Sequence, residues 1–128
     1  MKPIVIIPAL NPDEKLVTLV EQLKQYDLTT VIVNDGSTPG YEIIFDILKE
    51  KLDCVVCVHT KNMGKGVALK TGIAYAANVY PDAPGYVTAD ADGQHSPEDI
   101  LKVARMMEKN SGKFILGTRD FNHEKNAL

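Results

Sequence analysis

Residues 86–95 read Tyr86-Val87-Thr88-Ala89-Asp90-Ala91-Asp92-Gly93-Gln94-His95, a short apolar, β-prone segment that ends on two carboxylates and a turn glycine. In a parallel α/β sheet, ligands bind at the carboxyl ends of the strands, so both acids are expected to point toward a cleft. Two converging anions are costly unless a cation lies between them. Aspartate oxygens suit hard ions such as Mg²⁺ or Mn²⁺, which also bind phosphate oxygens. The stretch therefore predicts a metal-diphosphate site.

The same motif has two other interpretations. An Asp-x-Asp at a strand end is often a solvated turn in which the side chain bonds to the backbone. A calcium loop of the EF-hand type fits poorly, because counting from Asp90 puts His95 and Leu101 where glycine and glutamate are required. The rest of the chain has to decide between a solvated turn and a metal site.

Strand-like and helix-like segments alternate along the whole chain. Continuous apolar or β-branched runs predict strands at residues 3–8, 29–33, 54–59, 86–89 and 114–116. Apolar residues at helical spacing fill the segments between these runs. This alternation indicates a mostly parallel sheet covered on both faces, so we expect a three-layer α/β fold. The 128 residues suit a single domain, residues 1–128, with a real hydrophobic core.

Two of the predicted helices have marked starting signals. Asn11 is expected to be the N-cap of the first helix, with Pro12 at the first helical position and Glu14 closing a capping box. Ser96 followed by Pro97 gives the corresponding signal for the last helix.

The loops that follow successive strands are expected to gather at one edge of this sheet. They carry Pro8, Ala9, Asp35, Asp90, Asp92 and Arg119. Polar and turn residues concentrated on one edge indicate a ligand-binding crevice.

Composition narrows the class of protein. The hydrophobic fraction of 45% and the charged fraction of 24% are ordinary for a globular domain. The net charge of −3 and the lack of a basic run argue against nucleic acid as a partner. No stretch approaches the roughly 20 apolar residues that span a bilayer, and no signal-peptide pattern is present. We therefore expect a cytoplasmic location, or the cytoplasmic face of a membrane for a longer protein.

Cys54 and Cys57 have the spacing of a redox pair but the wrong setting. Redox pairs of this spacing lie at a helix N-terminus, whereas Cys54 to His59 is predicted to be a strand, on which residues three apart face opposite sides. Two reduced, partly buried cysteines are expected.

Two common nucleotide-binding motifs are absent. The first strand-helix turn, residues 9–12, has no glycine, whereas a dinucleotide fold requires Gly-x-Gly-x-x-Gly there. Gly64-Lys65-Gly66 is only superficially similar to a Walker A loop, because the earlier glycine and the Ser or Thr after Lys65 are missing. These departures disfavour NAD enzymes and P-loop NTPases.

Four motifs, taken in order, resemble those of family-2 glycosyltransferases, which are inverting enzymes with the GT-A nucleotide-sugar fold. The motifs are Ile6-Ile7-Pro8-Ala9-Leu10-Asn11, Val33-Asn34-Asp35-Gly36-Ser37, Asn62-Met63-Gly64-Lys65-Gly66 and Asp90-Ala91-Asp92-Gly93-Gln94-His95. The chain is most similar to the dolichol-phosphate mannose synthase and polyprenyl-phosphate sugar transferase branch. The resemblance covers residues 3–119.

The resemblance implies a nucleoside slot at the first two strand ends. Pro8 and Ala9 would line this slot through their backbone, and Asp35 would accept a hydrogen bond from the base or the ribose. The alternative for Asp35 is a capping or turn acid without contact to the nucleotide.

The resemblance also implies a metal-diphosphate site. Asp90 and Asp92, together with Gln94, would surround a Mg²⁺ or Mn²⁺ ion bound to the diphosphate, with Asp92 as the catalytic residue. Lys65 and Arg119 are candidate phosphate contacts, because their positive charge complements the diphosphate. Both can equally be solvated surface residues.

The sequence departs from the family pattern in the first loop. Pro12 follows Asn11, where members of the family commonly carry an acidic residue. Two interpretations stay open: Asp13 or Glu14 replaces this acidic residue of the family, or these two residues only cap the helix. His59 falls in none of the motifs.

The resemblance implies that such enzymes are longer and that an acceptor-binding half follows the fifth strand. We therefore expect a GT-A fold truncated after the fifth strand: a donor-binding half without its acceptor half, inactive by itself and able to pair with a second copy through an exposed sheet edge. The expected partners are a UDP-sugar or GDP-mannose donor and a polyprenyl-phosphate or glycan acceptor. The alternatives are a non-catalytic nucleotide-binding or assembly module and, less favoured, a nucleotidyltransferase-like enzyme.

Overall fold

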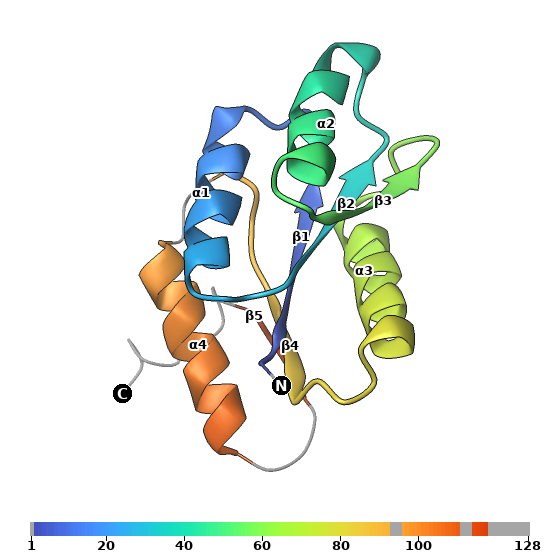
Figure 1. Cartoon of the computed structure of the whole chain (residues 1–128). Helices are drawn as coiled ribbons and strands as arrows, with labels where there is room; N and C mark the ends of the chain where they lie inside the picture. The colour runs from blue at the N-terminus through green and yellow to red at the C-terminus, as the bar shows by residue number, and fades with distance from the viewer. Residues whose placement is uncertain (1, 93–95, 111–113, 118–128) are drawn as a thin grey trace, which may run out of the picture.

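The structure is a computed structural model that describes residues 2–92, 96–110 and 114–117. Its elements, in chain order, are β1 (Ile4–Ala9), α1 (Glu14–Gln25), β2 (Thr30–Asp35), the short 3-10 helix η1 (Pro39–Tyr41), α2 (Glu42–Glu50), β3 (Val55–His59), α3 (Lys65–Val79), β4 (Gly85–Thr88), α4 (Pro97–Lys109) and β5 (Phe114–Gly117) (Figure 1). These five strands form one sheet in the order β3-β2-β1-β4-β5, and every pairing is parallel. The predicted α/β fold class is confirmed.

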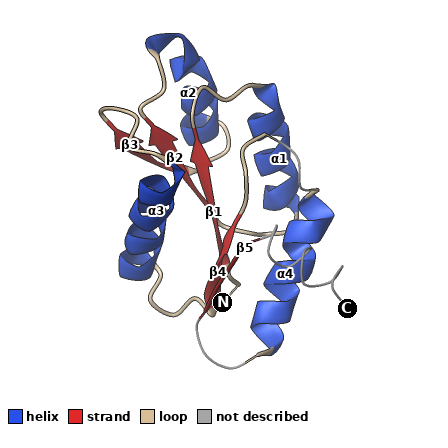
Figure 2. Cartoon of the chain, turned by 180° about the vertical axis from the view of Figure 1, so that it is seen from behind, coloured by secondary structure: helices blue, strands red, loops and turns tan. Residues whose placement is uncertain are grey.

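Helices cover both faces of the sheet, which gives three layers. Figures 1 and 2 show α3 on one face and α1, α2 and α4 on the other. In β1, Val5 and Ile7 pack in the core under α1, α2 and α4, whereas Ile4 and Ile6 pack in the core under α3. This two-sided burial explains why the first strand is a continuous apolar run.

The predicted start of α4 is confirmed, and the predicted start of α1 is wrong. Ser96 caps α4 by accepting a hydrogen bond from the amide of Asp99, and Pro97 is the first helical residue. The N-cap of α1 is Asp13, whose carboxylate accepts from the amide of Lys15. Asn11 lies outside the helix, and its side-chain oxygen accepts a hydrogen bond from the backbone of Thr38 instead.

The two cysteines are free thiols on opposite faces of the sheet, as predicted. Cys54 packs beside the core under α1 and α2, whereas Cys57 packs beside the core under α3. Burial raises the pKa of Cys54 to about 11 and also raises the pKa of Cys57. Neither thiol has the low pKa that a redox pair requires.

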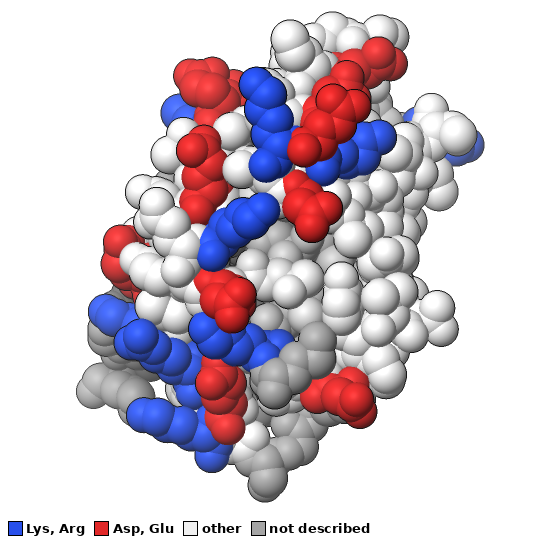
Figure 3. Space-filling view, viewed as in Figure 1, with Lys and Arg blue, Asp and Glu red and all other residues white. Residues whose placement is uncertain are grey.

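The outer side of the helical layer carries mixed charge. Acidic and basic side chains alternate over the face that α1, α2 and α4 form (Figure 3). This is the solvent-facing side of amphipathic helices. No helix in the described part of the chain is long and apolar enough to cross a membrane.

Candidate functional site

Two neighbouring pockets open at the carboxyl ends of the strands. The first, the Asp35 pocket, has a volume of about 320 Å³ and is lined by Pro8, Ala9, Leu10, Asp35, Asn62, Gly64, Lys65 and Asp90. The second, the Asp92 pocket, has a volume of about 350 Å³ and is lined by Leu10, Asn11, Pro12, Asp13, Lys65, Asp90, Ala91 and Asp92. The pockets share Leu10, Lys65 and Asp90, so they form one continuous site.

The structure brings most of the predicted site residues together. Pro8, Ala9, Asp35, Lys65, Asp90 and Asp92 line one or both pockets. Gln94 and Arg119 lie outside the described residues. The strand ends therefore gather six side chains or backbone segments that are separated by up to 84 positions along the chain, as a parallel sheet with ligands at its carboxyl edge requires.

Lys65 and Asp90 form an ion pair where the two pockets meet. Lys65 is the first residue of α3, and its Nζ lies 2.5 Å from Oδ1 of Asp90, in the loop after β4. The Lys65 side chain is 58% exposed and that of Asp90 is 17% exposed. A flexible, exposed ammonium group can leave one carboxylate for another anion at little cost. Lys65 can thus neutralise Asp90 or reach toward a phosphate.

The Asp92 pocket has the donor set that a magnesium-like ion uses. Asp90 and Asp92 both line it, and Mg²⁺ is usually held by one or two carboxylates together with substrate phosphates and water. No cluster of three or more His, Cys, Asp or Glu side chains suited to a metal occurs within residues 2–92, 96–110 and 114–117. Asp90 and Asp92 could therefore supply two ligands of such an ion, and its other ligands would have to come from other groups.

The first loop places an acidic residue beside this donor set. Asp13, the N-cap of α1, lines the Asp92 pocket, whereas Glu14 lines a separate pocket between α1 and α4. Of the two residues that sequence left open for the first-loop role, Asp13 is the one beside the site.

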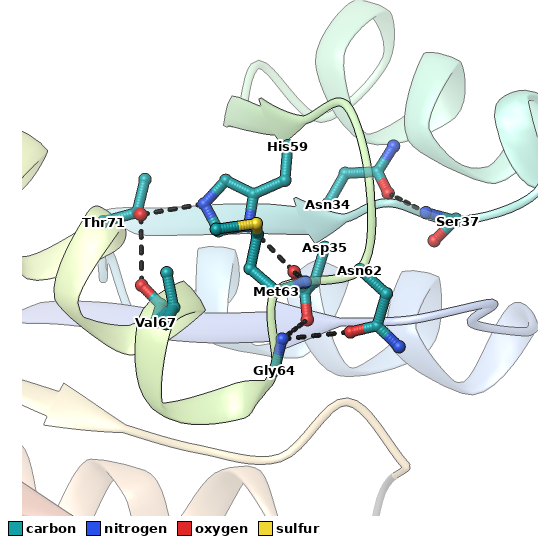
Figure 4. A network of polar contacts seen from close by, with 9 residues as sticks. All are labelled: Asn34, Asp35, Ser37, His59, Asn62, Met63, Gly64, Val67 and Thr71. Atoms are coloured by element: carbon teal, nitrogen blue, oxygen red, sulfur yellow. Dashed lines mark hydrogen bonds and ion pairs between the residues drawn. The ribbon is translucent and has the colours of Figure 1, made fainter.

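Asp35 is a buried carboxylate that accepts hydrogen bonds from three groups (Figure 4). It is 4% exposed and ends β2. Its Oδ1 lies 2.8 Å from Nδ1 of His59 and accepts from the amide of Met63, while its Oδ2 accepts from the amide of Gly64. Burial alone would raise the pKa of Asp35, but these hydrogen bonds together hold it below the usual value. Asp35 is therefore ionised at neutral pH and anchors the loop before α3.

Hydrogen bonds also link the loop after β1 to the loop after β2. The amide of Asn11 donates to Oγ of Ser37, and the amide of Thr38 donates to the side-chain oxygen of Asn11. The side chain of Asn34 accepts from the amide of Ser37 within the same turn (Figure 4). The walls of the site are therefore held by side chains that bridge separate strand ends.

His59 is the residue that sequence reasoning missed. It belongs to none of the four motifs, yet its ring bonds to Asp35 and Thr71. A usable signal exists, because His59 is a polar residue predicted at the carboxyl end of a strand, as Asp35 is. The pairing of β2 with β3 places these two residues opposite each other.

Comparison with known proteins gives a consistent family assignment. A model described as glycosyl transferase family 2 matches residues 4–127. The chain is 31% identical over 131 residues to a UDP-N-acetylglucosamine--dolichyl-phosphate N-acetylglucosaminyltransferase of Methanococcus voltae, a match that covers 89% of this chain and 50% of that protein. It is 34% identical over 125 residues to an uncharacterised protein of Methanocaldococcus jannaschii, covering 95% of this chain and 49% of that protein.

A bacterial relative is also named as a sugar transferase, and its name mentions undecaprenyl phosphate. An undecaprenyl-phosphate 4-deoxy-4-formamido-L-arabinose transferase of Proteus mirabilis is 29% identical over 130 residues, covering 94% of this chain and 37% of that protein. The chain spans about half the length of the first curated relatives it matches. No solved structure gives a significant match.

Proposed function

The chain belongs to glycosyl transferase family 2, and on that basis we propose that it forms the donor-binding part of a glycosyltransferase. The donor is a nucleoside-diphosphate sugar, with a UDP-sugar or GDP-mannose as the candidates. The sugar is transferred with inversion to a polyprenyl phosphate or a glycan. The observation that carries this proposal is the convergence of Pro8, Ala9, Asp35, Lys65 and Asp90 around one pocket at the carboxyl edge of the sheet.

The Asp35 pocket is the proposed nucleoside site. Its lining combines the apolar groups of Pro8, Ala9 and Leu10 with the Asp35 carboxylate. A carboxylate has about four acceptor positions, and the contacts of Asp35 with described residues use three of them. The remaining position, on Oδ2, can accept a hydrogen bond from an N–H group of a base or from a ribose hydroxyl.

The Asp92 pocket is the proposed diphosphate site. Asp90 and Asp92 supply hard oxygen ligands for Mg²⁺ or Mn²⁺, and Lys65 supplies a positive charge at the junction of the pockets. When bound, the ion neutralises the charge that develops on the departing nucleoside diphosphate. Asp92 is accordingly the proposed catalytic residue, with Gln94 as a further ligand and Arg119 as a further phosphate contact.

We infer a phosphate acceptor rather than a sugar hydroxyl, because a phosphate requires less of the protein. A phosphate monoester has a second pKa of about 6, so it presents an anionic oxygen at neutral pH and needs no side-chain base for its attack on the anomeric carbon. A sugar hydroxyl needs a general base. The names of the relatives from Methanococcus voltae and Proteus mirabilis, which mention dolichyl and undecaprenyl phosphate, support the same choice.

Coupled binding of metal and nucleotide tests the proposal. Because Asp90 and Asp92 share one pocket, Mn²⁺ and UDP or GDP should each tighten the binding of the other by about 5- to 150-fold, the usual range of coupling between sites. Isothermal titration of each ligand, with and without the other, measures this factor. Asp92→Asn should abolish it, whereas Asp46→Asn, a matched change on the exposed side of α2, should not. Independent binding of metal and nucleotide in the unaltered chain would contradict the proposal.

A further inference from the structure

The ring of His59 is held at both nitrogens. His59 ends β3 opposite Asp35, and its side chain is only 13% exposed. Nδ1 lies 2.8 Å from Oδ1 of Asp35, and Nε2 lies 2.8 Å from Oγ1 of Thr71 on α3. Figure 4 shows the imidazole between these two partners. A ring fixed at both ends can orient a carboxylate in a way that a freely rotating side chain cannot.

The contacts decide which nitrogen carries a proton. An ionised carboxylate only accepts hydrogen bonds, so Nδ1 must carry the hydrogen that lies between His59 and Asp35. The hydroxyl of Thr71 also lies 3.1 Å from the carbonyl oxygen of Val67 and can donate its one hydrogen either there or to Nε2. A ring with its hydrogen on Nδ1 is tied to α3 when the Thr71 hydroxyl donates to Nε2, and a ring protonated at both nitrogens is tied when Nε2–H donates to Oγ1. In both cases Nδ1 remains the donor to Asp35.

The Asp35 carboxylate in turn holds the backbone of the loop before α3. It accepts from two successive amides, those of Met63 and Gly64. Asn62 and Gly64 from this loop line the Asp35 pocket together with Asp35 itself. One wall of the pocket is therefore fixed by a chain of contacts that runs from Thr71 through His59 and Asp35 to the Asn62–Gly64 segment.

We propose that His59 is a positioning residue of the nucleoside site: through its Nδ1–H it fixes the Asp35 carboxylate, and thereby the Asn62–Gly64 wall and the acceptor position on Oδ2. The inference rests on the proposed function, because it assigns a role within the same nucleotide pocket. His59 touches no substrate in this role. Thr71 acts one step further back by holding the ring.

A ligand-free experiment tests the anchoring. Amide hydrogen exchange followed by NMR reports on Met63 and Gly64. His59→Phe keeps an aromatic ring but removes both polar contacts, so exchange at these two amides should accelerate about tenfold, which corresponds to the loss of one hydrogen bond to a charged group. His59→Asn retains a side-chain N–H donor and should restore most of the protection. Thr71→Val is a milder change that should raise exchange in the same direction.

A matched control separates this effect from general destabilisation. Thr18→Val makes the same chemical change as Thr71→Val at an exposed position of α1, on the opposite face of the sheet. It should leave exchange at Met63 and Gly64 unchanged. Unchanged exchange in His59→Phe, or equal effects of the two threonine variants, would overturn the inference.

A nucleotide experiment tests the positioning. The probes are UDP, GDP and CDP, each with Mn²⁺. For this test we assign the remaining acceptor position on Oδ2 to a ring N–H of the base and not to a ribose hydroxyl, which UDP and CDP share. Uracil and guanine offer such an N–H, whereas N3 of cytosine is an acceptor, so the unaltered chain should prefer UDP to CDP. His59→Phe should weaken UDP about tenfold while changing CDP much less, because only the first ligand uses the oriented carboxylate. A merely structural role would weaken both equally, and that result would overturn the inference.

The two ideas fail in different ways. If neither UDP nor GDP binds the unaltered chain, the proposed function fails, and the nucleotide role of His59 fails with it. If UDP binds but His59→Phe leaves both the exchange rates and the preference for UDP intact, only the role of His59 fails.

Discussion

Replacing Gly36 with alanine is expected to destabilise the fold strongly, because two loops of the site cross at this residue. Gly36 has a φ of +73°, a conformation in which side chains are strained. A Cβ at this position would overlap the backbone carbon of Lys61 and the backbone nitrogen of Asn62, and it would lie 2.8 Å from Lys61 Cα. Backbone atoms cannot rotate away as a flexible side chain can, so the Lys61–Asn62 segment would have to shift.

The expected cost is the sum of two effects. The left-handed conformation costs about 1–2 kcal/mol for a residue with a Cβ, and forced displacement of packed atoms typically costs about 1–3 kcal/mol. The free energy of unfolding should therefore fall by about 2–5 kcal/mol, a large part of the roughly 5–15 kcal/mol that stabilises a typical domain. The shift also pulls the amides of Met63 and Gly64 away from Asp35, so nucleotide binding should weaken in the molecules that remain folded.

Urea unfolding followed by circular dichroism measures this change, and two glycines provide matched controls. A Cβ on Gly40 or Gly66 would meet nothing within 4 Å. Gly66 lies in α3, where alanine is favoured over glycine, so Gly66→Ala should leave stability unchanged or raise it by up to about 1 kcal/mol. If Gly36→Ala has the same unfolding midpoint as Gly40→Ala and Gly66→Ala, the inferred crossing of the two loops is wrong.

Three further predictions concern charges and thiols. Lys65→Met removes the side chain that competes with a metal for Asp90. The affinity for Mn²⁺ alone should therefore rise by up to about fivefold, the limit for an exposed ion pair. Titration with UDP in the presence of Mn²⁺ should show weaker binding, because the variant lacks the positive charge proposed to contact the diphosphate. Burial alone would raise the pKa of Asp35, but its hydrogen bonds hold that pKa below the usual value. The ionised carboxylate therefore stabilises the fold fully above the unfolded pKa of about 4. This contribution is lost as the pH falls through the lowered pKa of the folded state. Asp35→Asn should accordingly flatten the acid side of a plot of unfolding free energy against pH. Because burial raises the pKa of Cys54 to about 11, its alkylation by iodoacetamide, followed by mass spectrometry, should accelerate toward pH 11 and remain slow at pH 8.

The architecture was predictable because the patterns that specify it are local. Buried strands appear as continuous apolar runs. The start of α4 is marked by neighbouring residues alone, with Ser96 as the N-cap and Pro97 as the first helical residue. The alternation of such signals leaves a parallel sheet as the simple solution, and the ligand edge follows from that topology. Pro8, Ala9, Asp35 and Asp90 could be placed at one site for this reason, without knowledge of any contact between them.

The start of α1 could not be predicted from local signals alone. Asn11 and Asp13 are both good capping residues, and they flank the same proline. The choice is made by a contact that is distant in sequence, because the side chain of Asn11 accepts a hydrogen bond from Thr38 in the loop after β2. Asn11 also adopts a φ of +49°, which asparagine tolerates better than most residues. Asn11, which sequence signals indicated as a helix cap, therefore links the loop after β1 to the loop after β2 by hydrogen bonds.

The partner of Asp35 was beyond sequence reasoning for a related reason. Asp35 and His59 are 24 positions apart, and only the register of the β2–β3 pairing puts them side by side. A shift of one residue would turn one of the two side chains to the other face of the sheet and break the contact. The sequence contains both strand ends but not the register that aligns them. The two interpretations left open for Asp35, a structural anchor or a nucleotide ligand, are compatible, because the carboxylate that fastens the loop before α3 keeps one acceptor position beside the pocket.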